Sequence, residues 1–80
     1  MAVEVSHLRY VVAAAEHRSF RRAAAALNIT QPTLSKRIRE LESRLGVLLF
    51  ERSTGGARLT VIGRDFVATA RRVLSDLSFM

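Results

Sequence analysis

The chain has 80 residues, 49% of them hydrophobic, and its 13 Lys and Arg residues exceed its 7 Asp and Glu residues, giving a formal net charge of +6. This length suits one small domain and excludes an enzyme that needs a substrate cleft as well as a scaffold. The basic charge indicates a polyanionic partner, but it does not choose between a nucleic acid and an anionic membrane. No cysteine is present, which excludes a disulfide framework and a thiolate metal site.

The first predicted helix runs from Ser6 to Glu16, with Ser6 as its N-terminal cap. The longest apolar run in this region is too short for a secretion signal or a membrane span, so we expect a cytoplasmic protein with no membrane partner. Apolar residues recur along one helical face at Leu8, Val11, Val12 and Ala15.

A helix, a tight turn and a second helix are predicted over residues 19–38. Ser19 is a suitable cap for a helix from Phe20 to Leu27. Asn28 tolerates the left-handed backbone that a sharp turn needs. This arrangement is typical of a protein that reads the major groove of DNA.

The next helix is predicted to begin after Thr30, which serves as its cap, and to end at Gly46. Its first turn accepts Pro32, because the missing N–H would have no partner inside the helix. One face of this helix is apolar and should belong to the core, with Leu34, Ile38, Leu41 and Leu45.

The opposite face of the same helix carries candidate DNA-binding residues. Gln31 can pair with adenine and Lys36 with guanine, while the Pro32 ring can contact a thymine methyl group. The other interpretation is that Lys36 and Arg39 only keep an exposed face soluble. At about 100° per residue this face holds Pro32, Lys36, Arg39 and Ser43, flanked by Thr33 and Ser35.

Several arginines outside this helix are placed at turns, helix starts and strand ends, where they can reach phosphates. Arg18 is one of them. Arg52 has the alternative of pairing with Glu51 or Glu42. The predicted DNA-binding set is Arg21, Arg22, Thr30, Gln31, Pro32, Thr33, Ser35, Lys36, Arg39, Arg52 and Arg58.

Two glutamates follow in the same helix, and both would repel phosphate. They are Glu40 and Glu42, and Glu40 is four residues before Arg44, a spacing that allows the two to pair on one helical face. We therefore expect the C-terminal half of this helix to face away from DNA, which agrees with insertion of its N-terminal end.

Two short strands are predicted after Gly46, from Leu48 to Arg52 and from Arg58 to Thr60. Between them lies Ser53–Gly56, whose two glycines can adopt the positive φ values of a tight hairpin. This hairpin is a candidate wing.

Thr60 is a suitable cap for a long final helix. Its apolar surface is wider than a small domain needs, so we expect part of it to pair with a second copy of the chain. The predicted dimerisation residues are Ile62, Phe66, Val67, Ala70, Val73, Leu74 and Leu77.

No pattern of catalytic or metal-binding residues stands out. His7 and His17 are about 280° apart around the first helix, so they cannot share a metal there, and we expect both to be ordinary surface or edge residues. A nucleophile with its base, a glycine-rich phosphate loop and a supported carboxylate pair are all missing from the sequence. We expect no enzyme activity and no cofactor.

Taken together, these residues resemble the N-terminal winged helix-turn-helix domain of LysR-type transcriptional regulators. The resemblance covers nearly the whole chain and is carried by Leu8-Arg9-Tyr10, Ser19-Phe20, Ala23-Ala24, Leu27, Gln31-Pro32, Ser35, Leu41-Glu42, Leu45-Gly46, Leu49-Phe50-Glu51-Arg52, Leu59-Thr60 and Gly63.

The resemblance implies sequence-specific binding of double-stranded DNA in a bacterium. Gln31, Pro32, Ser35 and Lys36 match groove-contacting positions of the family, where Lys36 is commonly Arg. It also implies a homodimer, with higher homo-oligomers open for the full-length protein, and a small-molecule effector bound by a C-terminal domain that this chain lacks. Leu48 and the wing tip Gly55-Gly56 depart from the family pattern.

The expected fold class is mainly α: a winged helix-turn-helix with a three-helix core, a short two-stranded wing and a long C-terminal linker helix. Residues 1–60 are predicted to form the DNA-binding domain, and residues 61–80 the start of a dimerising linker helix. The alternative function is a protein-interaction module that docks an acidic partner, and exposed aromatic residues on the third helix would favour it. There are none from Thr30 to Arg44.

Overall fold

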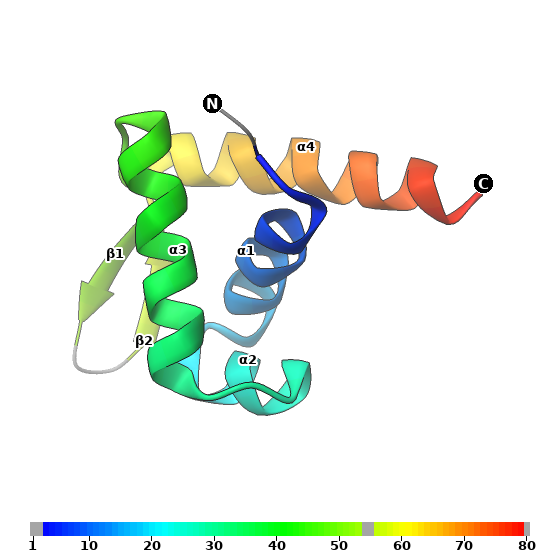
Figure 1. Ribbon diagram of the computed structural model, residues 1–80. Coiled ribbons are helices and arrows are strands. Elements are labelled where there is room, and N and C mark those ends of the chain that lie inside the picture. The colour runs from blue at the N-terminus through cyan, green and yellow to red at the C-terminus, as the bar shows by residue number, and fades with distance from the viewer. Residues whose placement is uncertain (1–2, 54–55, 80) are drawn as a thin grey trace.

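The computed structural model describes residues 3–53 and 56–79 and confirms the predicted fold class. Three helices pack together, a two-stranded hairpin flanks them, and a fourth helix packs across the first and projects beyond the rest of the fold (Figure 1). The elements are α1 (Val5–His17), α2 (Phe20–Leu27), α3 (Gln31–Leu45), β1 (Phe50–Ser53), β2 (Gly56–Leu59) and α4 (Val61–Ser78).

The starts of α2, α3 and α4 are fixed by local hydrogen bonds, as predicted. In each case a hydroxyl of the preceding residue satisfies a backbone N–H that has no partner inside the helix. The Oγ atom accepts from the N–H three residues later: Ser19 from Arg22 at 3.1 Å, Thr30 from Thr33 at 3.4 Å and Thr60 from Gly63 at 2.9 Å.

The start of α1 differs from the prediction, and Ser6 is not its cap. The helix begins at Val5 with Glu4 as the N-cap, and the backbone N–H of Glu4 donates to Nδ1 of His7 at 3.0 Å. His7 is only 3% exposed, so its expected surface position was also wrong. The imidazole thus closes the first turn of the helix from a buried position.

The turns that follow α1, α2 and α3 each contain a residue in the left-handed conformation. Asn28 adopts φ 60° and ψ 41°, which confirms its predicted role, and Gly46 ends α3 with φ 73°. Arg18 takes the same kind of conformation after α1, with φ 53°. A side chain other than Gly or Asn is costly there, so the surrounding packing must hold Arg18 in place.

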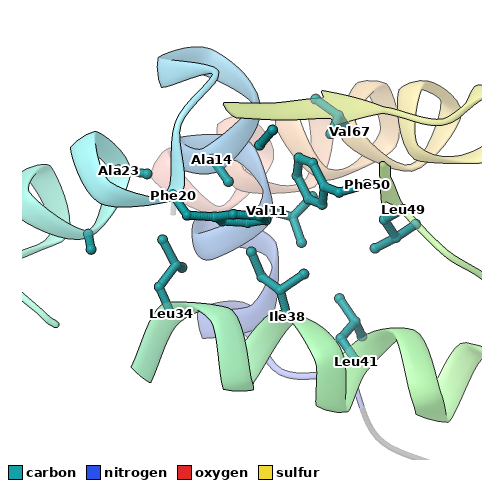
Figure 2. Packing of buried hydrophobic residues seen from close by; sticks show 12 residues of the cluster. Val11, Ala14, Phe20, Ala23, Leu34, Ile38, Leu41, Leu49, Phe50 and Val67 are labelled. Carbon is teal, nitrogen blue, oxygen red and sulfur yellow. The ribbon is translucent and has the colours of Figure 1, made fainter. Parts of the chain in front are cut away.

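One core joins all the elements (Figure 2). The aromatic rings of Phe20 and Phe50 meet edge to face with centroids 5.4 Å apart, linking α2 to β1. Leu45, predicted in the α3 core stripe, is only half-buried. The other buried side chains of the core include Val11, Ala14, Ala23, Leu34, Ile38, Leu41, Leu49 and Val67.

The hairpin is present, but its strands are shifted from the predicted positions. The ladder pairs Phe50 with Leu59 and ends with Ser53 opposite Gly56. It begins two residues later than predicted, and the N–H groups of Leu49 and Phe50 donate to the Glu42 side chain of α3. Gly56 has a positive φ of 150°, and Gly55 lies outside the described residues.

The wing is fastened to the end of α1. The N–H of Ala57 donates to the carbonyl oxygen of Arg18 at 3.2 Å. A Cβ atom on Gly56 would stand 2.5 Å from that same oxygen, so only glycine allows this approach. The left-handed turn at Arg18 therefore presents the acceptor that holds the wing.

The final helix has two apolar faces, and the domain itself uses one of them. Val67 and Ala70 are 2% and 1% exposed and pack toward the rest of the core. Val73 and Leu77 remain 39% and 41% exposed. The helix predicted as a linker therefore also completes the fold.

Candidate nucleic-acid interface

The polar face of α3 is solvent-exposed, as its periodicity predicts. Pro32, Lys36 and Arg39 project from it, and Ser35 is half-buried at its edge. A shallow hollow runs along this face and is lined by Gln31, Pro32, Ser35, Lys36, Arg39, Glu40, Ser43 and Arg44. The side chains predicted to meet base edges thus share one surface.

At the N-terminal end of α3 two threonines hold each other. The Thr30 hydroxyl donates to Oγ1 of Thr33 at 2.8 Å while it accepts from the Thr33 N–H. Both side chains are exposed. The pair therefore keeps hydrogen-bonding capacity toward the outside at this exposed end of α3.

The predicted phosphate-contacting arginines of α2 lie beside this end of α3. Arg21 and Arg22 are exposed in the first turn of α2. They line a hollow together with Ser19, Gln31 and the wing residue Ser53 among others. The structure therefore brings Arg21, Arg22 and Gln31 together next to the recognition face.

Arg58 lies elsewhere. It is exposed on β2, opposite Glu51 across the hairpin, and lines a hollow with Arg18 and Arg64 that contains no residue of α3. Arg64 was not among the residues predicted from the sequence. The signal that identified Arg21, a basic residue near the start of a predicted helix, is also present at Arg64. The DNA contact of Arg58 stays a prediction.

Arg52 is bound inside the domain, and of its two possible carboxylate partners the structure shows Glu42. Nη2 of Arg52 lies 3.3 Å from Oε1 of Glu42, and the guanidinium carbon stands 4.7 Å above the ring of Phe20. Nη1 donates to Oγ of Ser35 at 2.9 Å. A phosphate contact by Arg52 remains a prediction.

Burial shifts the proton affinity of this guanidinium without discharging it. Desolvation lowers the pKa of Arg52, the Glu42 carboxylate acts in the opposite direction, and the charge of Arg39 adds to the lowering. An arginine remains protonated in proteins even so. Arg52 is therefore a permanent cation between α3 and the wing.

Glu42 does not face phosphate, contrary to the role expected for it. It is 6% exposed, and its Oε2 accepts from the N–H of Leu49 at 2.8 Å and of Phe50 at 3.2 Å. The carboxylate ties the end of α3 to the beginning of the wing. Of the two glutamates, only Glu40 is placed where it could repel phosphate. Its Oε1 atom lies 3.9 Å from Nη1 of Arg37. The predicted pairing of Glu40 with Arg44 stays a prediction.

The described part of the chain contains neither a cluster of metal-ligating side chains nor a candidate membrane span. Residues 3–53 and 56–79 contain no group of three metal-ligating His, Asp or Glu side chains. Within the same ranges no helix combines the length and apolar character needed to cross a membrane.

Residues 5–64 match the family described as the bacterial regulatory helix-turn-helix proteins of the lysR family. The chain belongs to the LysR family. The architecture of this LysR-family domain, with its capped helix-turn-helix and its hairpin, agrees with that assignment.

The curated relatives of this LysR-family chain are transcriptional regulators. The HTH-type transcriptional regulator YnfL of Escherichia coli K12, itself described as uncharacterized, is 48% identical over 75 residues, which cover 94% of this chain and 25% of YnfL. The DNA-binding transcriptional dual regulator OxyR of the same strain is 45% identical over 78 residues, covering 98% of this chain and 26% of OxyR. The chain thus spans about a quarter of the length of these relatives.

Solved structures of DNA complexes share the LysR-family fold. The complex of the CbnR DNA-binding domain with DNA superimposes with a TM-score of 0.92 at 38% identity, covering 95% of this chain and 87% of the CbnR chain. The BenM DNA-binding domain with its catB site 1 DNA gives a TM-score of 0.94 at 42% identity, covering 98% and 87%. These proteins are winged helix domains seen on DNA.

Proposed function

We propose that this chain is the DNA-binding domain of a bacterial, cytoplasmic LysR-type regulator, and that it binds double-stranded DNA in a sequence-specific manner as a dimer. The first half of α3 carries the proposal: its exposed face presents Gln31, Pro32 and Lys36, with no acidic side chain before Glu40. Such a surface offers hydrogen bonds to base edges while attracting phosphate.

The recognition end of α3 enters the major groove, and the arginines of α2 fix its register. Arg21 and Arg22 neutralise phosphates beside the groove, since they share a hollow with Gln31. Regulation by a small-molecule effector belongs to the full-length protein, in a C-terminal domain outside this chain.

Selection of bound sequences from a random double-stranded library tests the proposal. We expect enrichment of a two-fold-related motif whose half-sites lie about 10 base pairs apart or a multiple of this, because two recognition helices must enter one face of the duplex. Affinity for the selected DNA should exceed that for scrambled DNA at every salt concentration. Salt-dependent binding without enrichment would contradict the proposal and favour the protein-interaction module.

The roles of Lys36 and Arg22 are expected to separate on substitution. Lys36→Ala should cost about 1 to 3 kcal/mol on the selected site and relax the preference at one base pair. Arg22→Ala should weaken selected and scrambled DNA equally and reduce the salt slope by about 1. Binding titrations across a salt series measure both effects, and identical losses on all DNAs for the two variants would contradict the assignment.

Dimerisation is proposed to use the exposed apolar face of α4. Ile62, Val73 and Leu77 are 51%, 39% and 41% exposed, and the half-buried Phe66 and Leu74 border them. Val67 and Ala70 are enclosed by their own domain, so the surface left for a partner is narrower than the predicted set.

Leu77→Asp is expected to shift the chain toward the monomer, because it would place a charge in an apolar helix pair. Sedimentation equilibrium at several protein concentrations measures the change, with Ser75→Asp on the opposite side of α4 as the matched control. Equal association constants for the two variants would show that α4 pairs through another face. The full-length protein provides a second test with the rest of the helix present.

A further inference from the structure

The contact between Arg52 and Ser35 has a direction that chemistry fixes. A guanidinium has only donors, so in the 2.9 Å contact Nη1 donates and the Ser35 oxygen accepts. The Ser35 proton is therefore not used in this bond. The accepting role of the Ser35 oxygen follows from its partner and does not depend on an assigned hydrogen position.

The Ser35 proton has no acceptor among the described residues. A serine inside a helix commonly returns its proton to a carbonyl one turn earlier, and no such bond is formed by Ser35 within residues 3–53 and 56–79. Ser35 instead lines the hollow on the exposed face of α3 with Gln31 and Lys36. Its proton is thus available on the surface proposed to meet DNA.

The neighbouring charge strengthens this polarity. Arg52 is held by Glu42 and by the ring of Phe20, so its guanidinium is not free to turn away from Ser35. A hydroxyl that accepts from a cation becomes a better donor and a poorer acceptor for its next partner. The exposed side of Ser35 should therefore favour electron-rich atoms.

We propose that Arg52 is a positioning residue that makes Ser35 a hydrogen-bond donor, so that α3 uses Ser35 to recognise an acceptor on DNA. The acceptor is a purine N7, a guanine O6, a thymine O4 or a phosphate oxygen, and the amino groups of adenine and cytosine are disfavoured. This inference rests on the proposed function. It assigns Arg52 a part in DNA recognition even where its guanidinium touches no phosphate.

The test uses the 80-residue chain and the DNA obtained by selection. Analogues delete one group at a time: N7, O6 or O4 as acceptors, and adenine N6 or cytosine N4 as donors, with uncharged methylphosphonates replacing single phosphates. We expect one acceptor deletion to weaken binding about tenfold in the parent chain and to have no effect in Ser35→Ala. A base analogue or a methylphosphonate at that position tells whether the acceptor is a base or the backbone.

The part played by Arg52 is tested by a double-mutant cycle on the same pair of DNAs. The measured quantity is the affinity for the selected DNA divided by the affinity for the DNA that lacks the acceptor. Arg52→Met should reduce this ratio from about tenfold to about threefold or less, and should leave it unchanged when Ser35→Ala is already present. A change in folding alone would alter the affinities for both DNAs by the same factor and would leave their ratio unchanged. Because Arg52→Met strands the buried Glu42 charge, the double variant Glu42→Gln with Arg52→Met repeats the test without an unpaired carboxylate.

Three results would overturn the inference. The affinity ratio of the two DNAs could stay the same in both Arg52 variants, or Arg52→Met could change it equally when Ser35 is already Ala. Alternatively, Ser35→Ala could abolish the effect of deleting a donor group and of no acceptor group. Failure of the proposed function is a separate result. In that case the parent chain selects no sequence, whereas failure of the inference leaves a selected sequence and its affinity in place.

Discussion

Gly63→Ala is expected to destabilise the domain by at least about 3 kcal/mol or to prevent folding. An added Cβ atom would collide with the backbone carbonyl oxygen of Leu49 and would also stand 3.1 Å from Cδ2 of Leu59. The Leu49 carbonyl cannot retreat, because it accepts from the N–H of Thr60 at 3.0 Å and its own N–H is bound to Glu42. Thermal and urea unfolding followed by circular dichroism measure the loss.

Gly46→Ala is the matched control for this substitution. Gly46 has φ 73°, and no atom of residues 3–53 or 56–79 lies within 4 Å of the position of an added Cβ. Only backbone strain opposes the change, so we expect a loss of about 1 kcal/mol. Equal losses for Gly46→Ala and Gly63→Ala would mean that the start of α4 can move away from Leu49 at little cost.

Glu42→Ala is expected to cost about 3 to 5 kcal/mol, because it leaves a partly buried cation without its partner. The substitution also removes the acceptor for two backbone N–H groups, those of Leu49 and Phe50. Equilibrium urea unfolding measures the change. We further expect the first strand of the wing to lose protection in amide hydrogen exchange before the helices do.

Two variants separate the charge of Glu42 from its hydrogen bonds. Glu42→Gln keeps an oxygen for the backbone N–H groups and should cost less than Glu42→Ala. Glu51→Ala removes an exposed carboxylate from the neighbouring strand and should change stability by no more than about 0.5 kcal/mol. A loss for Glu42→Ala as small as that for Glu51→Ala would show that the network contributes nothing to folding.

Features decided by neighbouring residues could be predicted from the sequence. Ser19, Thr30 and Thr60 cap their helices because a hydroxyl reaches an N–H only three residues away. Asn28 forms the turn because its side chain tolerates a left-handed backbone. The start of α1 was missed because a buried imidazole, that of His7, does the work usually done by Ser or Thr.

The features that could not be predicted depend on residues brought together by the fold. The pairing of Glu42 with Arg52 was one of two alternatives open from the sequence, but its bonds to the backbone N–H groups of Leu49 and Phe50, beyond the turn at Gly46, were not foreseen. The hydrogen bond from Arg52 to Ser35 spans 17 residues. No local pattern states that an arginine of the wing will support a serine of the recognition helix.

Periodicity revealed the apolar surface of α4 without revealing what covers each part of it. The spacing places Val67 and Val73 in neighbouring stripes of one wide surface. Burial separates them, since Val67 is 2% exposed and Val73 is 39% exposed. The boundary predicted at residue 60 thus marks a change of secondary structure, while the hydrophobic core continues into the helix that follows.

The continuous core has a consequence for exchanging this domain between proteins. A fusion that joined a foreign dimerisation helix directly after Thr60 would discard Val67 and Ala70 and open the packing beneath α1. A junction beyond Leu74 would keep both side chains and replace only turns that project from the fold. The transferable unit is therefore the winged domain together with most of α4, and its orientation relative to a new partner is set by where along that helix the sequences are joined.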